Sequence, residues 1–239
     1  MANLQLFAGA VDGAVESSSA AYADAVAGTG TAALAADAAG LTLAVVSGIA
    51  NNNSAATYIC TEAFISFDLS TLPPGCIVRG ATLSLYHNAS AVDVAFTAEV
   101  RTYDWGAGVT TADWVGGASL GALPLLASLA STAFAATQYN AFASLPTLAA
   151  ALQAAAGGTL RMIINNSLHR LATAPGLNVF SNIIFQSADT ALTTQDPKLD
   201  IFYEWQPVIG RSHPQRRKQI VYPGSVGKAS AVGYGYGYR

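Results

Sequence analysis

Two short runs of alternating apolar and polar residues flank a proline-rich turn near the middle of the first half of the chain. The runs are Phe64–Leu69 and Ala81–Tyr86. A period of two is typical of a strand with one buried face. Between the runs, Pro73-Pro74-Gly75 interrupts any ladder, because proline has no N–H donor and glycine adopts unusual dihedral angles. The segment therefore predicts a strand, a crossover and a second strand.

The same patterns predict further strands and a single helix. The helix is expected at Pro146–Ala156, with Ser144 as its cap and Gly157-Gly158 as its end. The polar segment Asn51–Tyr58 is expected to be a loop. The further strands are Leu41–Val46, Val92–Tyr103, Thr159–Asn165, Val179–Gln186 and Lys198–Tyr203. We predict a mostly β protein, an antiparallel jelly-roll-like β-sandwich with one short helix and extended N- and C-terminal arms.

The segment FDLSTLPPGCIVRGATLSLY resembles the signature of the DNRLRE-type β-sandwich family, which is related to carbohydrate-binding modules. TTADWVGG around Trp114 and the closing DPKLDIFY (Asp196–Tyr203) add to this resemblance, which spans about residues 21–204. It implies a jelly-roll-like fold of the kind found in secreted polysaccharide-binding proteins and in phage structural proteins. The signature positions are Phe67, Asp68, Leu69, Leu72, Pro73, Gly75, Ala81, Leu83, Leu85 and Tyr86.

Charge divides the chain into a body and an arm. Up to Glu204 there are 14 acidic and five basic residues, a net charge of −9; from Trp205 onward there are six basic residues and no acid, a net charge of +6. Together they give the chain's net −3. We therefore expect an N-terminal arm at residues 1–20, a β-sandwich domain at 21–204 and a basic, Gly/Tyr-rich C-terminal arm at 205–239.

The composition and the first residues of the chain bear on whether it enters a membrane or is secreted. Charged residues make up only 10% of the 239 residues, and apolar residues 52%. No uninterrupted apolar run reaches the about 18 residues of a membrane span, so we expect no membrane partner. The start MANLQLFAGAVDG lacks the features of a secretory signal, so we expect a chain that stays in the cytoplasm or one whose signal has been removed.

Candidate catalytic and metal-binding groups are few. GASLG (117–121) matches the G-x-S-x-G pattern, but a turn-like segment precedes Ser119, and the only later histidine, His213, lies in the arm. Cys60 and Cys76 have no cysteine or histidine at metal-ligand spacing, and we expect reduced core residues, although a bridge is open if their strands are neighbours. The scattered acids Asp93, Glu99, Asp104 and Asp113 could bring two carboxylates together as in a glycosidase, but such acids more often serve turns and solubility. We expect no enzyme, cofactor or metal.

Aromatic residues offer an alternative function. Trp105 and Trp114 lie in the loop DWGAGVTTADW, where exposed tryptophans would form a platform for stacking sugars. A core or loop-anchoring role is the more common fate of such side chains in sandwiches. The alternative is therefore a carbohydrate-binding module of an exported enzyme or adhesin.

The arm carries the main functional hypothesis. Tyrosine gives a large contact area and glycine allows close backbone approach, which suits docking on a neighbouring subunit. We expect a tailed-phage virion structural protein, either a head decoration or cement protein or a tail or fibre-associated module. It would be assembled in the host cytoplasm, would be homo-oligomeric and would bind capsid or tail subunits, with host surface glycan as a further partner. Nucleic acid is disfavoured, because the acidic body would repel phosphate. The assembly residues are Arg211, Arg216, Arg217, Lys218, Tyr222, Tyr234, Tyr236 and Tyr238.

Overall fold

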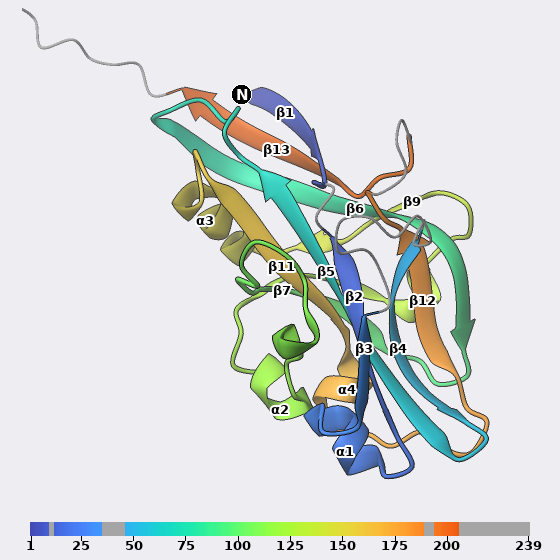
Figure 1. The fold of residues 1–239 in the computed structure, drawn as a ribbon. Helices are drawn as coiled ribbons and strands as arrows, with labels where there is room; N and C mark the ends of the chain where they lie inside the picture. Colours follow the sequence, from blue (N-terminus) through green and yellow to red (C-terminus); the bar gives the residue numbers. More distant parts are fainter. Residues whose placement is uncertain (10–11, 35–45, 189–193, 206–239) are drawn as a thin grey trace, which may run out of the picture. The chain divides into compact units, whose positions relative to one another are not determined.

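A computed structural model describes residues 1–9, 12–34, 46–188 and 194–205 (Figure 1). All strand pairs in these residues are antiparallel. The strands are β1 Ala2–Phe7, β2 Gly13–Ser19, β3 Thr31–Leu34, β4 Val46–Ser54, β5 Thr57–Asp68, β6 Cys76–Val92, β7 Thr97–Thr102, β8 Leu125–Ala130, β9 Tyr139–Ala141, β10 Ala143–Ser144, β11 Thr159–Asn166, β12 Ser181–Gln186 and β13 Lys198–Trp205. The helices are α1 Tyr22–Ala27, α2 Gly117–Leu120, α3 Pro146–Ala154 and α4 Ser167–Arg170. The predicted mostly β, antiparallel fold is confirmed.

The strand order explains the proline-rich turn. Strands follow one another as β1-β13-β6-β12-β4-β5-β11-β7-β8-β10, while β2 pairs with β5 and β3. The two strands of the opening segment, β5 and β6, are thus separated by β12 and β4. The predicted crossover is confirmed, since Pro73, Pro74 and Gly75 carry the chain between strands that do not pair with each other. Gly75 has φ of 75°, a conformation that favours glycine.

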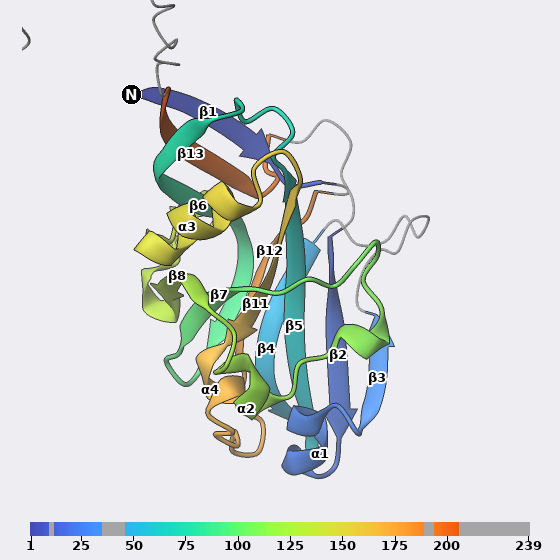
Figure 2. The same ribbon diagram turned by 90° about the vertical axis from the view of Figure 1, so that its left-hand side faces the viewer.

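The main core joins side chains from strands that lie far apart in the strand order. Side chains from β6, β12 and β13 pack with side chains from β7, β8 and β11, and α3 adds Leu148 and Leu152. Figure 2 shows α3 beside β6 and β8. The alternating residues of the signature segment supply the centre of this core: Ile65, Phe67, Leu69, Ala81, Leu83 and Leu85.

A second apolar cluster covers the opposite face of β5. Phe64 of β5, Ile163 of β11 and Val15 of β2 pack against residues of the segment 103–123. In Figure 2 this segment, with α2, runs across β11, β5 and β2. Strand β5 is therefore buried on both faces along Cys60–Phe67.

The N-terminal part differs from the sequence prediction. Residues 1–20 do not form an arm, because β1 pairs with β13 and β2 pairs with β5. Leu4 and Leu6 pack against the main core, and Ala14 and Val15 are buried. Each strand is short and its apolar residues are small or few, so the pattern was too weak to indicate a strand before its partners were known.

Other element predictions also change. Residues Asn51–Tyr58 are not a loop but the tip of the β4–β5 hairpin, whose turn residues Ala55 and Ala56 have φ of 48° and 63°. The described residues hold four α-helices rather than one. The cap of α3 is Leu145, which makes no side-chain cap hydrogen bond, and the predicted cap Ser144 belongs to β10. Of the predicted strand Leu41–Val46, residues 41–45 lie outside the described residues.

The core predicts a clear stability difference between two leucines. Leu83 is fully buried, whereas Leu177 is 64% exposed. Replacing Leu83 with Ala should lower the free energy of unfolding by about 2–5 kcal/mol, because it leaves a cavity. The matched control Leu177→Ala should change it by less than about 0.5 kcal/mol. Urea denaturation measures both, and equal effects would contradict the assignment of the core.

Candidate functional site

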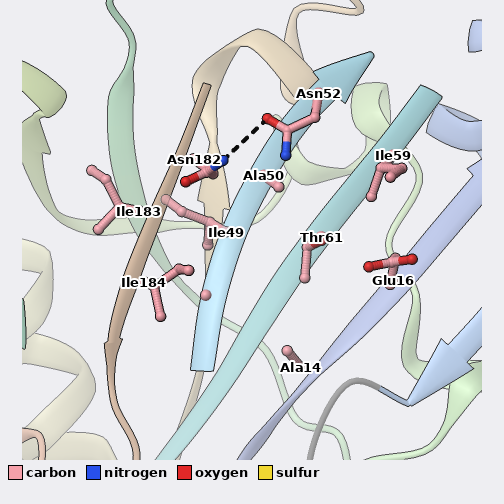
Figure 3. A pocket seen from close by; sticks show the side chains of 11 residues that line it. Ala14, Glu16, Ile49, Ala50, Asn52, Ile59, Thr61, Asn182, Ile183 and Ile184 are labelled. Carbon is pink, nitrogen blue, oxygen red and sulfur yellow. Dashed lines mark hydrogen bonds between the residues drawn. The ribbon is translucent and has the colours of Figure 1, made fainter. Parts of the chain in front are cut away.

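An open pocket lies on one face of four neighbouring strands, β2, β5, β4 and β12 (Figure 3). Its volume is about 290 Å³, near the lower limit of about 300 Å³ for small-molecule sites. The strand registers align Glu16 with Thr61, Thr61 with Ala50 and Ala50 with Asn182. These four residues therefore form one row across the pocket. Small residues such as Ala14, Gly48 and Ala50 keep the floor low.

Glu16 is the single charged residue of the pocket lining. Its side chain is half-buried, and burial raises the pKa of its carboxyl group above the usual 4.5. Within the described residues no hydrogen bond or ion pair reaches this carboxyl group.

Two amides form the far side of the pocket. Asn182 donates from Nδ2 to Oδ1 of Asn52 at 3.5 Å, and the backbone N–H of Ser181 donates to the same oxygen at 2.8 Å. Asn182 in turn accepts from the backbone N–H of Ala91 at 3.2 Å. These bonds fix both amides, so the pocket wall is preformed.

A buried acid and a buried histidine meet on the opposite face of β5. Oε1 of Glu62 lies 3.6 Å from Nδ1 of His169, and both side chains are fully buried. The backbone N–H of Val115 donates to Oε2 of Glu62 at 2.9 Å, and the Trp114 ring lies against His169 with centroids 5.1 Å apart. Glu62 thus anchors the segment 103–123 to the sheet from below.

Burial shifts both members of this pair toward their uncharged forms. It raises the pKa of Glu62 well above 4.5 and lowers the pKa of His169 to about 4. A group with no access to the surface cannot exchange substrate, so we assign the pair a structural role in holding Val115 and Trp114.

The shifted acid predicts how stability depends on pH. Because Glu62 has a higher pKa when folded than unfolded, its contribution to stability is lost as pH rises above about 4.5. His169 acts in the other direction, losing stability as pH falls from about 6.5 toward 4. The variant Glu62→Gln keeps an acceptor for Val115 but removes the acid. The difference in free energy of unfolding between this variant and wild type should therefore favour the variant more at pH 8 than at pH 5, by about 1 kcal/mol or more.

Urea denaturation at the two pH values tests this expectation. Glu204→Gln, at an acid whose side chain is 43% exposed, is the control and should show no comparable change. If Glu62→Gln is instead less stable relative to wild type at pH 8 than at pH 5, Glu62 is charged in the folded protein and His169 compensates its charge.

A second buried acid, Glu99, ties three elements together. Arg170 of α4 donates to both its oxygens, at 2.7 and 2.8 Å. Arg101 of β7 donates at 3.0 Å, and Asn165 of β11 donates at 3.2 Å. Burial tends to raise the pKa of Glu99, but these donors outweigh it, so the pKa lies below 4.5. These bonds join β7, β11 and α4, so we assign Glu99 a structural role.

The two tryptophans do not form an exposed glycan platform. Trp105 is only 5% exposed and belongs to the second apolar cluster, with the Arg161 guanidinium 5.4 Å above its ring. Trp114 is half-buried and donates its indole N–H to the carbonyl of Val26 at 3.2 Å. The pattern of the loop could not show this, because the covering role appears only when the segment folds over β5.

Stability measurements distinguish the core role of Trp105 from a platform role. Trp105→Ala should lower the free energy of unfolding by about 3–5 kcal/mol. The matched control Trp205→Ala, at a side chain 60% exposed, should change it by less than about 0.5 kcal/mol. If Trp105→Ala is as stable as wild type but no longer binds on a glycan array, Trp105 is a sugar-binding residue and not a core residue.

The remaining sequence candidates are placed as follows. Ser119 is exposed on the one-turn helix α2, and no strand precedes it directly. Cys60 and Cys76 are buried and unbridged. Asp93 accepts a hydrogen bond from the backbone N–H of Phe180, Asp104 from Arg161, and Asp113 from the backbone N–H of Thr110. The described residues contain no cluster of three potential metal ligands, and no helix among them is long and apolar enough to cross a membrane. The arm residues Arg211, Arg216, Arg217, Lys218, Tyr222, Tyr234, Tyr236 and Tyr238 lie outside the described residues.

Comparison with protein-family models finds no match, and comparison with curated proteins finds none either. The resemblance to the DNRLRE-type family stays a prediction. Sequence reasoning missed the pocket and Glu16 altogether. The one available signal was a glutamate inside a run of small residues, AVESSS, but a pocket made from four strands requires their pairing to be known.

Proposed function

We propose that the chain is a non-enzymatic structural subunit of a bacteriophage virion, such as a head decoration or a tail-associated module. It would join neighbouring subunits through its C-terminal arm, residues 205–239. The virion setting comes from the sequence resemblance, and the docking role comes from the distribution of charge.

The observation that carries the docking role is that the body uses its own basic side chains internally. Each of the five has a partner: Arg79 with Glu204, Arg101 and Arg170 with Glu99, Arg161 with Asp104, and Lys198 over the Tyr139 ring. The other six basic residues of the chain all follow Trp205, in a segment that contains no acidic residue. A cationic arm beside a body of net charge −9 favours contacts between an arm and an acidic subunit.

A second feature that supports subunit contacts is the β1 edge. In the described residues, β1 pairs with β13 on one side only, so its other edge has free N–H and C=O groups (Figure 1). Large apolar side chains are exposed on the same two strands, namely Phe7, Phe202 and Trp205, and Met1 directly before β1 is exposed as well. Free strand edges and exposed aromatic residues are typical of surfaces that other chains cover.

The alternative, carbohydrate binding, was based on exposed tryptophans, but Trp105 is buried and Trp114 is half-buried. We therefore rank it below the structural role. A glycan array with the full chain remains the direct test, since specific binding would favour this alternative.

Removing the arm tests the proposed function. A chain ending at Gln206 should keep its far-ultraviolet circular dichroism spectrum, because the core clusters lie before that residue. It should no longer co-sediment with particles in a density gradient of virions produced in its presence. The control Arg161→Gln removes a basic group of the body and should be incorporated normally. Undiminished incorporation of the truncated chain would refute the arm model.

A further inference from the structure

The pocket around Glu16 contains a half-buried acid, and among the described residues no hydrogen bond or ion pair reaches its carboxyl group. Most other acidic side chains of the described residues have at least one hydrogen bond or ion pair. Glu16 has none in those residues, although it is half-buried beside Thr61 in a pocket with an apolar floor. Partial burial has removed some of the water from this carboxyl group, so a donor or a cation that enters the pocket would gain a charge-assisted hydrogen bond there.

The lining favours a cation over a neutral ligand. The other ten lining residues are uncharged, so nothing in the pocket wall competes with Glu16 for an incoming positive group. A neutral molecule would remove water from the carboxylate without replacing its charge interaction. A guanidinium group can donate two parallel hydrogen bonds to a carboxylate, and its aliphatic stem can lie on Ala50 and Ile59.

The shape favours a single side chain. The row from Glu16 to Asn182 crosses three strand spacings, about 14 Å, and the volume is about 290 Å³. A pocket of this volume would accommodate one long side chain, and Figure 3 shows Asn182 across the pocket from Glu16. It is too small for a folded domain.

We propose that this pocket is the receptor for an arginine or lysine of the arm segment Arg216-Arg217-Lys218 from a second copy of the chain. The inference rests on the proposed function, because it names the acceptor of the docking arm. Charge complementarity supports the occupant: the five basic side chains of the body are engaged, and the segment is the densest group of those that remain. A pocket on one copy and an arm on the next make a head-to-tail contact, which builds rings or filaments.

A complementation experiment with full-length chains tests the proposal. Glu16→Gln keeps the shape of the pocket but removes its charge, and Arg216→Gln/Arg217→Gln/Lys218→Gln neutralises the arm segment. Sedimentation velocity should show self-association of wild type, weakened by at least about tenfold in each variant. Mixing the two variants should restore dimers, because one variant supplies an intact arm and the other an intact pocket. The control Asp24→Asn removes an exposed acid outside the pocket and should associate like wild type.

The outcomes separate this inference from the proposed function. If Glu16→Gln associates like wild type while the arm variant does not, the arm docks elsewhere: the pocket proposal is overturned and the arm model survives. If Asp24→Asn weakens association as much as Glu16→Gln, the attraction is unspecific and the receptor is refuted. If wild type is monomeric, or the mixture does not recover, the occupant is not a second copy. Binding of a neutral oligosaccharide that Glu16→Gln abolishes would also overturn the cation assignment.

Discussion

Burial of β5 on both faces is the constraint from which the rest of the structure follows. Phe67 and Ile65 point into the main core, while Phe64 lies under the segment 103–123. A strand with two dry faces needs a covering layer on each side. The sheet itself supplies one layer through β6, β12 and β13. The other layer is an irregular segment held by Glu62 and by the Trp105 and Trp114 rings.

The irregular cover brings polar groups into the interior, and several of them form hydrogen bonds there. Val115 donates its N–H to Glu62, Trp114 donates to Val26, and Arg101 donates to the carbonyl of Leu123 at 2.7 Å. Such bonds are worth most where water is excluded, because the unpaired group would cost the full desolvation energy. The buried charges of this body therefore hold segments in place, which makes Glu16, without such a partner among the described residues, the exception.

The net charge of the body bears on the proposed role of the basic arm. A body that uses its basic side chains internally keeps a surplus of negative charge. In the contact that we propose, the arm of another subunit would meet this negative charge at the carboxyl group of Glu16 in the pocket. The β1 edge and the exposed Phe202 and Trp205 offer further contact surface on a different part of the molecule.

The sequence by itself determined the strands with strong alternation and the crossover between β5 and β6, because period two and prolines act locally. It also determined the division of charge at Trp205. It did not reveal β1 and β2, whose few apolar residues are buried only through pairing with distant strands. Nor could it decide whether Trp105 was a platform or a core residue, or gather Glu16, Thr61, Ala50 and Asn182 into one row. Those outcomes depend on which strands become neighbours, and only the tertiary structure sets that.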